Sequence, residues 1–117
     1  DKAGRVFAYI FFSAGGMGAR PGADGLSATA FPSGIKGVPA EAIEAVSPVL
    51  MRKRALRPDS GGPGKFRGGL GQEMVLEVRS EGAALHSCMY DRTQHPARGF
   101  LGGMEGATGE LFLASLS

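Results

Sequence analysis

The chain has 117 residues, of which 43% are hydrophobic and 21% charged, so its length allows one domain at most and its composition excludes wholesale disorder. Its formal net charge is +2 and its cations form no dense basic run, so we expect no nucleic-acid partner. The longest apolar run, Val6 to Phe12, is far too short for a membrane span of about 20 residues, so we expect no membrane partner.

Glycine and cysteine usage add two further expectations. The chain has 20 glycines, and glycine loses more conformational freedom on folding than other residues, so an isolated domain would be short of buried contacts. We therefore expect residues 1–117 to be a single segment of a larger subunit, as the start at Asp1 also indicates. Because Cys88 is the single cysteine, no intrachain disulfide forms, which is typical of a cytoplasmic protein.

The first half of the chain is predicted to hold a strand, a loop and a helix. Arg5 to Ser13 is rich in aromatic and β-branched residues, which is typical of a buried strand. Ala14 to Gly25 is a long glycine loop. Pro39 to Ser47 is the one good helix, because Pro39 suits a first helical turn and Pro48 stops the helix.

The second half is predicted to be mostly extended. Val49 to Leu56 is a predicted strand, and the turn-dense stretch Arg57 to Gly71 follows it. In Gln72 to Arg79, apolar and charged residues alternate as they do on a half-buried strand. Ala84 to Tyr90 and Leu111 to Leu116 are further predicted strands. The sequence thus predicts a mostly β (α+β) segment with one short helix and long glycine-rich loops.

The glycine loops do not match nucleotide-binding motifs. A dinucleotide fingerprint needs G-x-G-x-x-G opening a helix, but Gly16 to Pro21 ends in proline and precedes no helix. A P-loop needs Ser or Thr after its lysine, but Phe66 follows Lys65. Two interpretations stay open: the loops turn tightly and pack against neighbours, or they line a site for a small polar substrate.

Polar side chains inside these loops are the candidate substrate-binding residues. An arginine or a carboxylate inserted into a backbone stripped of side chains can line a site for a small polar molecule. We select four such residues: Arg20, Asp24, Asp59 and Ser60.

No catalytic residue or metal ligand is predicted in this segment. The one clustering of ligand-type residues is His86, Cys88, Asp91 and His95, and it matches no usual zinc spacing. As a nucleophile Cys88 would need a nearby histidine and a polarised setting, so we interpret it as a structural thiol.

Several stretches, taken in order, resemble one known family. Gly15 to Gly25, GGMGARPGADG, resembles the G-G-x-G-A-R-x-G-x-D-G segment of the hydantoinase B/oxoprolinase family. Val38 to Glu44 is similar to the helix that follows, Leu56 to Gly71 to the family's most recognisable stretch, and Tyr90 to Gly103 to its late loop. The resemblance covers nearly the whole chain, from about Gly4 to Gly109, and matches the C-terminal part of the family subunit.

This resemblance implies a hydrolase that opens cyclic amides of the hydantoin or 5-oxoproline type. The family includes the B subunit of N-methylhydantoinase, the matching half of 5-oxoprolinase and the related subunit of acetone carboxylase. In these enzymes an A-type subunit or domain binds ATP and phosphorylates the substrate, and the B part uses a metal ion held by an earlier region. ATP and a divalent metal are thus implied for the whole enzyme, and no cofactor for this segment.

The resemblance also implies partners and roles. The partners are the remainder of the same subunit, an ATP-binding A-type subunit and a small-molecule substrate. Arg20 would face an anionic group, and Asp24 and Asp59 would face ring N–H donors or frame the loop. Ala28 to Pro39 lacks the histidine and asparagine pair often found there in the family, which leaves the substrate class open. The alternatives are a docking module without site residues and part of an acetone carboxylase-like subunit.

Overall fold

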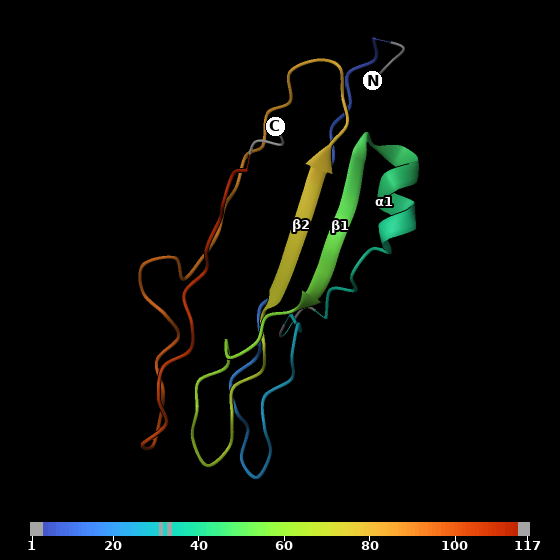
Figure 1. The fold of residues 1–117 in the computed structure, drawn as a ribbon. Helices are drawn as coiled ribbons and strands as arrows, with labels where there is room; N and C mark the ends of the chain where they lie inside the picture. The colour runs from blue at the N-terminus through green and yellow to red at the C-terminus, as the bar shows by residue number, and fades with distance from the viewer. Residues whose placement is uncertain (1–3, 31, 33, 115–117) are drawn as a thin grey trace.

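A computed structural model describes residues 4–30, 32 and 34–114. Within these residues the chain forms helix α1 (Ala40–Val46) and strands β1 (Val49–Leu56) and β2 (Gln72–Val78). The two strands pair antiparallel, and α1 packs along β1 (Figure 1). No helix in the described residues is long and apolar enough to cross a membrane.

Helix α1 confirms the prediction for Pro39 to Ser47. It begins directly after Pro39, whose φ of −59° is already helical, and Glu41 in the first turn favours the positive end of the helix dipole. At its other end the N–H and the hydroxyl of Ser47 both donate to the carbonyl oxygen of Ile43, at 3.1 and 2.8 Å. The helix ends there because Pro48 has no N–H with which to continue it.

The sheet has a charged face produced by a β-bulge. Met51 pairs with Leu76 and Lys53 with Val75, so Arg52 is an extra residue between the two pairs. A bulge breaks the alternation of side chains, which lets two consecutive cations reach the same face. Arg52 there bonds to Glu77 and Lys53 to Glu73, the latter at 2.8 Å.

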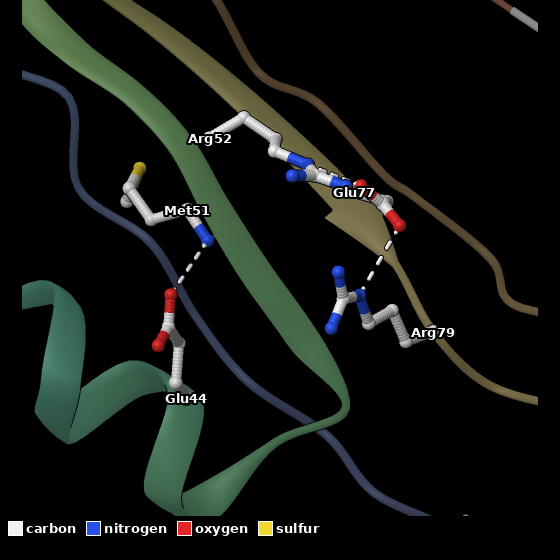
Figure 2. Close-up of polar contacts among 5 residues, drawn as sticks. All are labelled: Glu44, Met51, Arg52, Glu77 and Arg79. Atoms are coloured by element: carbon white, nitrogen blue, oxygen red, sulfur yellow. Dashed lines mark hydrogen bonds and ion pairs between the residues drawn. The ribbon is translucent and has the colours of Figure 1, made fainter. Parts of the chain in front are cut away.

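Two further polar contacts fix the upper part of the sheet (Figure 2). Glu77 also accepts a hydrogen bond of 3.2 Å from Arg79, so its carboxylate lies between two guanidinium groups. The hydrogen bond from Arg52, and secondarily that from Arg79, holds the pKa of Glu77 below its usual value of 4.5. Glu44 of α1 accepts from the backbone N–H of Met51 at 3.1 Å, which ties the helix to β1.

The opposite face of the sheet carries the small core. Ile43 of α1, Met51 of β1 and Met74 of β2 surround one shallow hollow together with residues 9–12. Among the described residues the buried hydrophobic side chains are Ile43, 3% exposed, and Val49, 7% exposed. The core is therefore very small for a chain of this length.

Three predicted strands are wrong for the described residues. The predicted strands at 5–13 and 84–90, and residues 111–114 of the third, show extended backbone without strand pairing; residues 115 and 116 lie outside the described part. Val6, in the strand predicted to be buried, is instead 99% exposed, and Leu85 and Leu113 in the other two segments are exposed by 95% and 102%. A strand needs a neighbour to satisfy its backbone groups, and no neighbour pairs with these segments in the described chain. The described fold is thus a small α/β arrangement, with the one short helix that was predicted and a sheet of two antiparallel strands in place of five.

Residues 84–114, here called the outer arm, make the molecule elongated. In Figure 1 they run as two extended segments, orange and red, outside the helix and the sheet. The radius of gyration is 16.7 Å and the extents are 56 × 27 × 20 Å. A compact domain of this length has a radius of gyration of about 13 Å.

Candidate functional site

Two loops, residues 15–29 and 57–71, pack backbone against backbone; we call them the loop pair. A Cβ added to Gly69 would lie less than 3.0 Å from the carbonyl oxygen of Leu26, and one on Gly16 equally close to the carbonyl of Gly69. The N–H of Gly69 donates to the carbonyl of Met17 at 2.8 Å, and the N–H of Ala28 to that of Leu70 at 2.8 Å. Glycine is required at these positions because no side chain fits between the two loops.

Arg20 and Asp24 lie at the tip of the first loop. The N–H and carbonyl of Arg20 exchange hydrogen bonds of 2.9 and 3.1 Å with Ala23, which closes a tight turn. The Arg20 guanidinium donates to the carbonyl oxygen of Asp24 at 3.3 and 3.4 Å, and both side chains are exposed. Asp24 in turn accepts from the backbone N–H of Arg67 at 2.8 Å, so it joins the two loop tips.

Asp59 and Ser60 lie in the turn that follows β1. Asp59 has a φ of +53°, a left-handed conformation that aspartate tolerates better than most residues. The hydroxyl of Ser60 donates to the carbonyl of Arg57 at 2.7 Å and accepts from the N–H of Gly71 at 2.9 Å. Ser60 therefore closes the base of the second loop. Within the described residues no hydrogen bond or ion pair engages the Asp59 carboxylate.

Arg57 is a residue of this region that sequence reasoning did not select. Its guanidinium donates to the carbonyl oxygen of Thr108 at 2.6 Å and forms an ion pair with Glu110 at 3.3 Å. The N–H of Ala107 also donates to the carbonyl of Ser60 at 3.1 Å. We call these contacts the clasp, because they fasten the outer arm to the loop pair. The partners are about fifty residues apart, and no local pattern in the sequence signals such a contact.

The structure brings the four predicted substrate-binding residues together only in pairs. Arg20 bonds to Asp24, and Asp59 adjoins Ser60, but no hydrogen bond or ion pair within the described chain joins the two pairs. None of the four lines either of two hollows near the sheet, one of which has a volume of about 190 Å³ and includes Lys36, Arg54 and Gln72. Their role in substrate binding stays a prediction.

Other kinds of site in the described residues would be a group of metal ligands or a phosphate-binding start of a helix. No group of three or more His, Cys, Asp or Glu side chains in the described chain is arranged to hold a metal. The side chain of Cys88 is half-buried. Burial of Tyr90 raises the pKa of its hydroxyl, and the neighbouring Cys88 adds a smaller effect in the same direction. The loop after Gly16 closes at Arg20 and Ala23 as a turn and does not open a helix, so it offers no helix N-terminus to a phosphate.

Comparison with known proteins identifies relatives over nearly the whole chain. The profile of a family described as hydantoinase B/oxoprolinase matches residues 1–116. The chain is 32% identical to 5-oxoprolinase 1 of Arabidopsis thaliana over 109 residues, which is 92% of this chain. It is 33% identical to the 5-oxoprolinase PfmaA of Pestalotiopsis fici over 100 residues, or 85% of the chain.

A third relative is an uncharacterized protein of Methanocaldococcus jannaschii, MJ0963, which is 39% identical over 75 residues, 64% of this chain. The aligned part makes up 13% of that protein and 8% of each of the two oxoprolinases. The chain therefore spans about a tenth of the length of the curated relatives it matches. No solved structure matches it.

Proposed function

This chain belongs to the hydantoinase B/oxoprolinase family, and we propose that it is part of a larger ATP-dependent hydrolase that opens cyclic amides of the hydantoin or 5-oxoproline type. The observation that carries the proposal is the alignment with Arabidopsis 5-oxoprolinase 1, which covers 92% of this chain. An alignment of that extent takes in both loops of the loop pair, where the four candidate residues lie.

In this proposal the loop pair orients the substrate. Arg20 is exposed and keeps guanidinium N–H groups beyond those that bond to Asp24, so it can donate to an anionic group such as a carboxylate. The Asp59 carboxylate can accept from a ring N–H, since no other described group engages it. Asp24 and Ser60 then serve mainly as the frame of the loops, because the Asp24 carboxylate already accepts a hydrogen bond from the other loop and the Ser60 hydroxyl already closes its own loop.

ATP and a divalent metal would be bound outside the residues described here. The described chain offers neither a metal-ligand cluster nor a phosphate loop, so no chemical step is assigned to its own side chains. The remainder of the subunit and an A-type ATP-binding subunit are the proposed partners. The proposal therefore predicts that residues 1–117 alone show no turnover.

The test is a turnover assay of the full-length subunit with its A-type partner. ATP, a divalent metal and either 5-oxoproline or N-methylhydantoin are supplied, and the ring-opened acid is measured together with ADP. We expect ring opening that requires ATP. Formation of a carboxylated product from acetone and bicarbonate, without ring opening, would instead assign the chain to an acetone carboxylase-like enzyme.

Arg20→Ala tests the role of the loop pair within the same enzyme. Loss of a charge-assisted hydrogen bond to substrate, about 1.5–3 kcal/mol, lowers kcat/KM by roughly 10- to 150-fold. Lys36→Ala, which removes an exposed cation outside the loop pair and the outer arm, is the matched control. Unchanged kinetics in Arg20→Ala would favour the docking-module alternative. The close backbone contacts of the glycines in the loop pair are consistent with that alternative.

A further inference from the structure

The chain exposes far more surface than a folded protein of its mass. Its accessible surface is 9328 Å² for 12.1 kDa. Folded monomers of this mass expose about 6,000 Å². The excess of about 3,000 Å² exceeds the roughly 800 Å² that each partner buries in an ordinary protein complex. The excess is therefore of the size buried in permanent interfaces.

Much of this exposed apolar surface lies on the outer arm. Leu85 and Leu113, one on each of its extended segments, are among its side chains that are almost completely accessible to solvent. The other large apolar residues that the arm exposes are Met89, Tyr90, Phe100, Leu101, Met104, Leu111 and Phe112. Soluble monomers rarely expose contiguous apolar patches above a few hundred Å², so a surface of this composition marks an interaction site.

Part of the backbone of the outer arm also lacks hydrogen-bond partners within the described residues. The arm has internal hydrogen bonds near its turn, such as that from the N–H of Gly109 to the carbonyl of Arg92 at 2.9 Å. Among the described residues, however, no backbone hydrogen bond is found for residues 84–90 or 110–114. These segments overlap the predicted strands Ala84 to Tyr90 and Leu111 to Leu116, and strands that lack neighbours are completed by the addition of further strands.

The arm is nevertheless held in a defined place. Arg57 bonds to Thr108 and Glu110 through the clasp, and the N–H of Met104 donates to the carbonyl of Pro63 at 2.9 Å. The arm is therefore fastened to the loop pair through residues 104–110, and its two extended segments lie away from the loop pair.

We propose that the outer arm is an interaction surface completed by another region of the same polypeptide, whose strands pair with residues 84–90 and 110–114 and bury the apolar side chains. The proposal rests on the part of the proposed function that makes this chain one portion of a longer subunit. It does not depend on which reaction that subunit catalyses.

A permanent cover is required, because a chain whose described part buries only two hydrophobic residues cannot keep its fold between encounters with a transient partner. A region of the same polypeptide can supply such a cover, because its covalent link to the arm keeps it at high effective concentration. The relatives, which are about ten times as long as the aligned part, have the chain length to provide it.

The test is cysteine labelling of the full-length subunit. Leu85→Cys and Leu113→Cys are each made in a Cys88→Ser background, and their reaction with a maleimide is followed by peptide mass spectrometry. The rate in the native subunit is compared with the rate in concentrated guanidinium. Glu81→Cys, an exposed polar position just before the arm, is the control that should react at similar rates in both conditions.

We expect native labelling at positions 85 and 113 to be at least about tenfold slower than in the unfolded subunit, since a buried thiol reacts through opening. Rates like that of the control would overturn the proposal. Protection that rises with protein concentration, or that arises only with the A-type subunit, would overturn it in favour of a second copy or of that subunit.

Hydrogen exchange of the unsubstituted subunit provides a second measurement that does not depend on the variants folding. Amides of residues 84–90 and 110–114 should be protected; exchange at the rate of unpaired backbone would contradict the proposed strand pairing. Neither measurement needs substrate, so the turnover assay reports separately on the proposed function.

Discussion

The Oδ1 atom of Asp24 accepts a hydrogen bond of 2.8 Å from the backbone N–H of Arg67, so a side chain predicted to bind substrate spans the two loops of the loop pair. The N–H of Gly25 donates in the opposite sense, to the carbonyl of Arg67, also at 2.8 Å. This reciprocal contact holds the loop tips together. It follows that loss of activity on removing Asp24 does not by itself establish a contact with substrate.

Asp24→Asn and Asp24→Ala separate the two roles. Asparagine keeps an oxygen acceptor for the Arg67 N–H, whereas alanine removes it, at a cost of about 1 kcal/mol for an ordinary hydrogen bond. We expect a lower Tm of the full-length subunit for alanine and a nearly unchanged Tm for asparagine. If asparagine also leaves kcat/KM unchanged, Asp24 frames the loops; if it lowers kcat/KM at constant Tm, the carboxylate contacts substrate.

Gly69→Ala is predicted to separate the loops. The new Cβ would lie under 3.0 Å from the carbonyl oxygen of Leu26, a backbone atom that cannot move without its loop. Overpacking of this kind costs typically 1–3 kcal/mol, so we expect a clearly lower Tm. Gly18→Ala is the control: nothing lies within 4 Å of its Cβ position, and its stability should stay within about 0.5 kcal/mol of wild type. Equal melting of the two variants would contradict the close packing.

The sequence predicts the helix and the two paired strands of this chain well, but it also predicts three strands that the described residues do not form. Val49 to Leu56 forms β1 with the predicted bounds, and Gln72 to Arg79 differs from β2 by one residue. The reason is that each carries its own signal, an apolar-rich run or an alternation bounded by turn residues. Arg5 to Ser13 carries the same kind of signal but forms no strand, because a strand also depends on a neighbour that its own sequence does not specify.

The candidate site is less predictable than the fold. Composition identifies Arg20, Asp24, Asp59 and Ser60 as polar residues among glycines, but not which of their atoms are already bonded within the chain. The structural partners of Asp24 and Arg57 lie 43 and 51 residues away in the sequence. Such contacts depend on how the loops meet, and no local periodicity encodes them.

The ionisation of Glu77 makes the stability of the sheet depend on pH. Its pKa in the folded chain lies below the usual 4.5, first because of the hydrogen bond from Arg52. A carboxyl with a lowered folded pKa contributes stability that is present above its unfolded pKa and is lost as the pH falls through the folded value. We therefore expect Glu77→Gln to lower Tm near neutral pH and to match wild type well below pH 4.5. A difference in Tm that stays constant over this range would show that the charge of Glu77 is not its cause.

The clasp predicts that Arg57 is not replaceable by lysine. Its guanidinium serves the carbonyl oxygen of Thr108 and the carboxylate of Glu110 through two different nitrogen atoms, and a lysine ammonium cannot reproduce that fork. We expect Arg57→Lys to destabilise the full-length subunit by about 1–2 kcal/mol, since a partly buried carbonyl loses its donor. Glu110→Gln keeps the Thr108 contact and removes only a partly exposed ion pair, so it should cost less than about 1 kcal/mol.

Denaturant unfolding of both clasp variants, with hydrogen exchange at residues 104–110, measures these effects. In Arg57→Lys the amide of Ala107, which donates to Ser60, should exchange faster than in wild type because the base of the arm is loosened. In Glu110→Gln it should exchange as in wild type. Equal and small effects in the two variants would mean that the arm is held by its cover and not by Arg57.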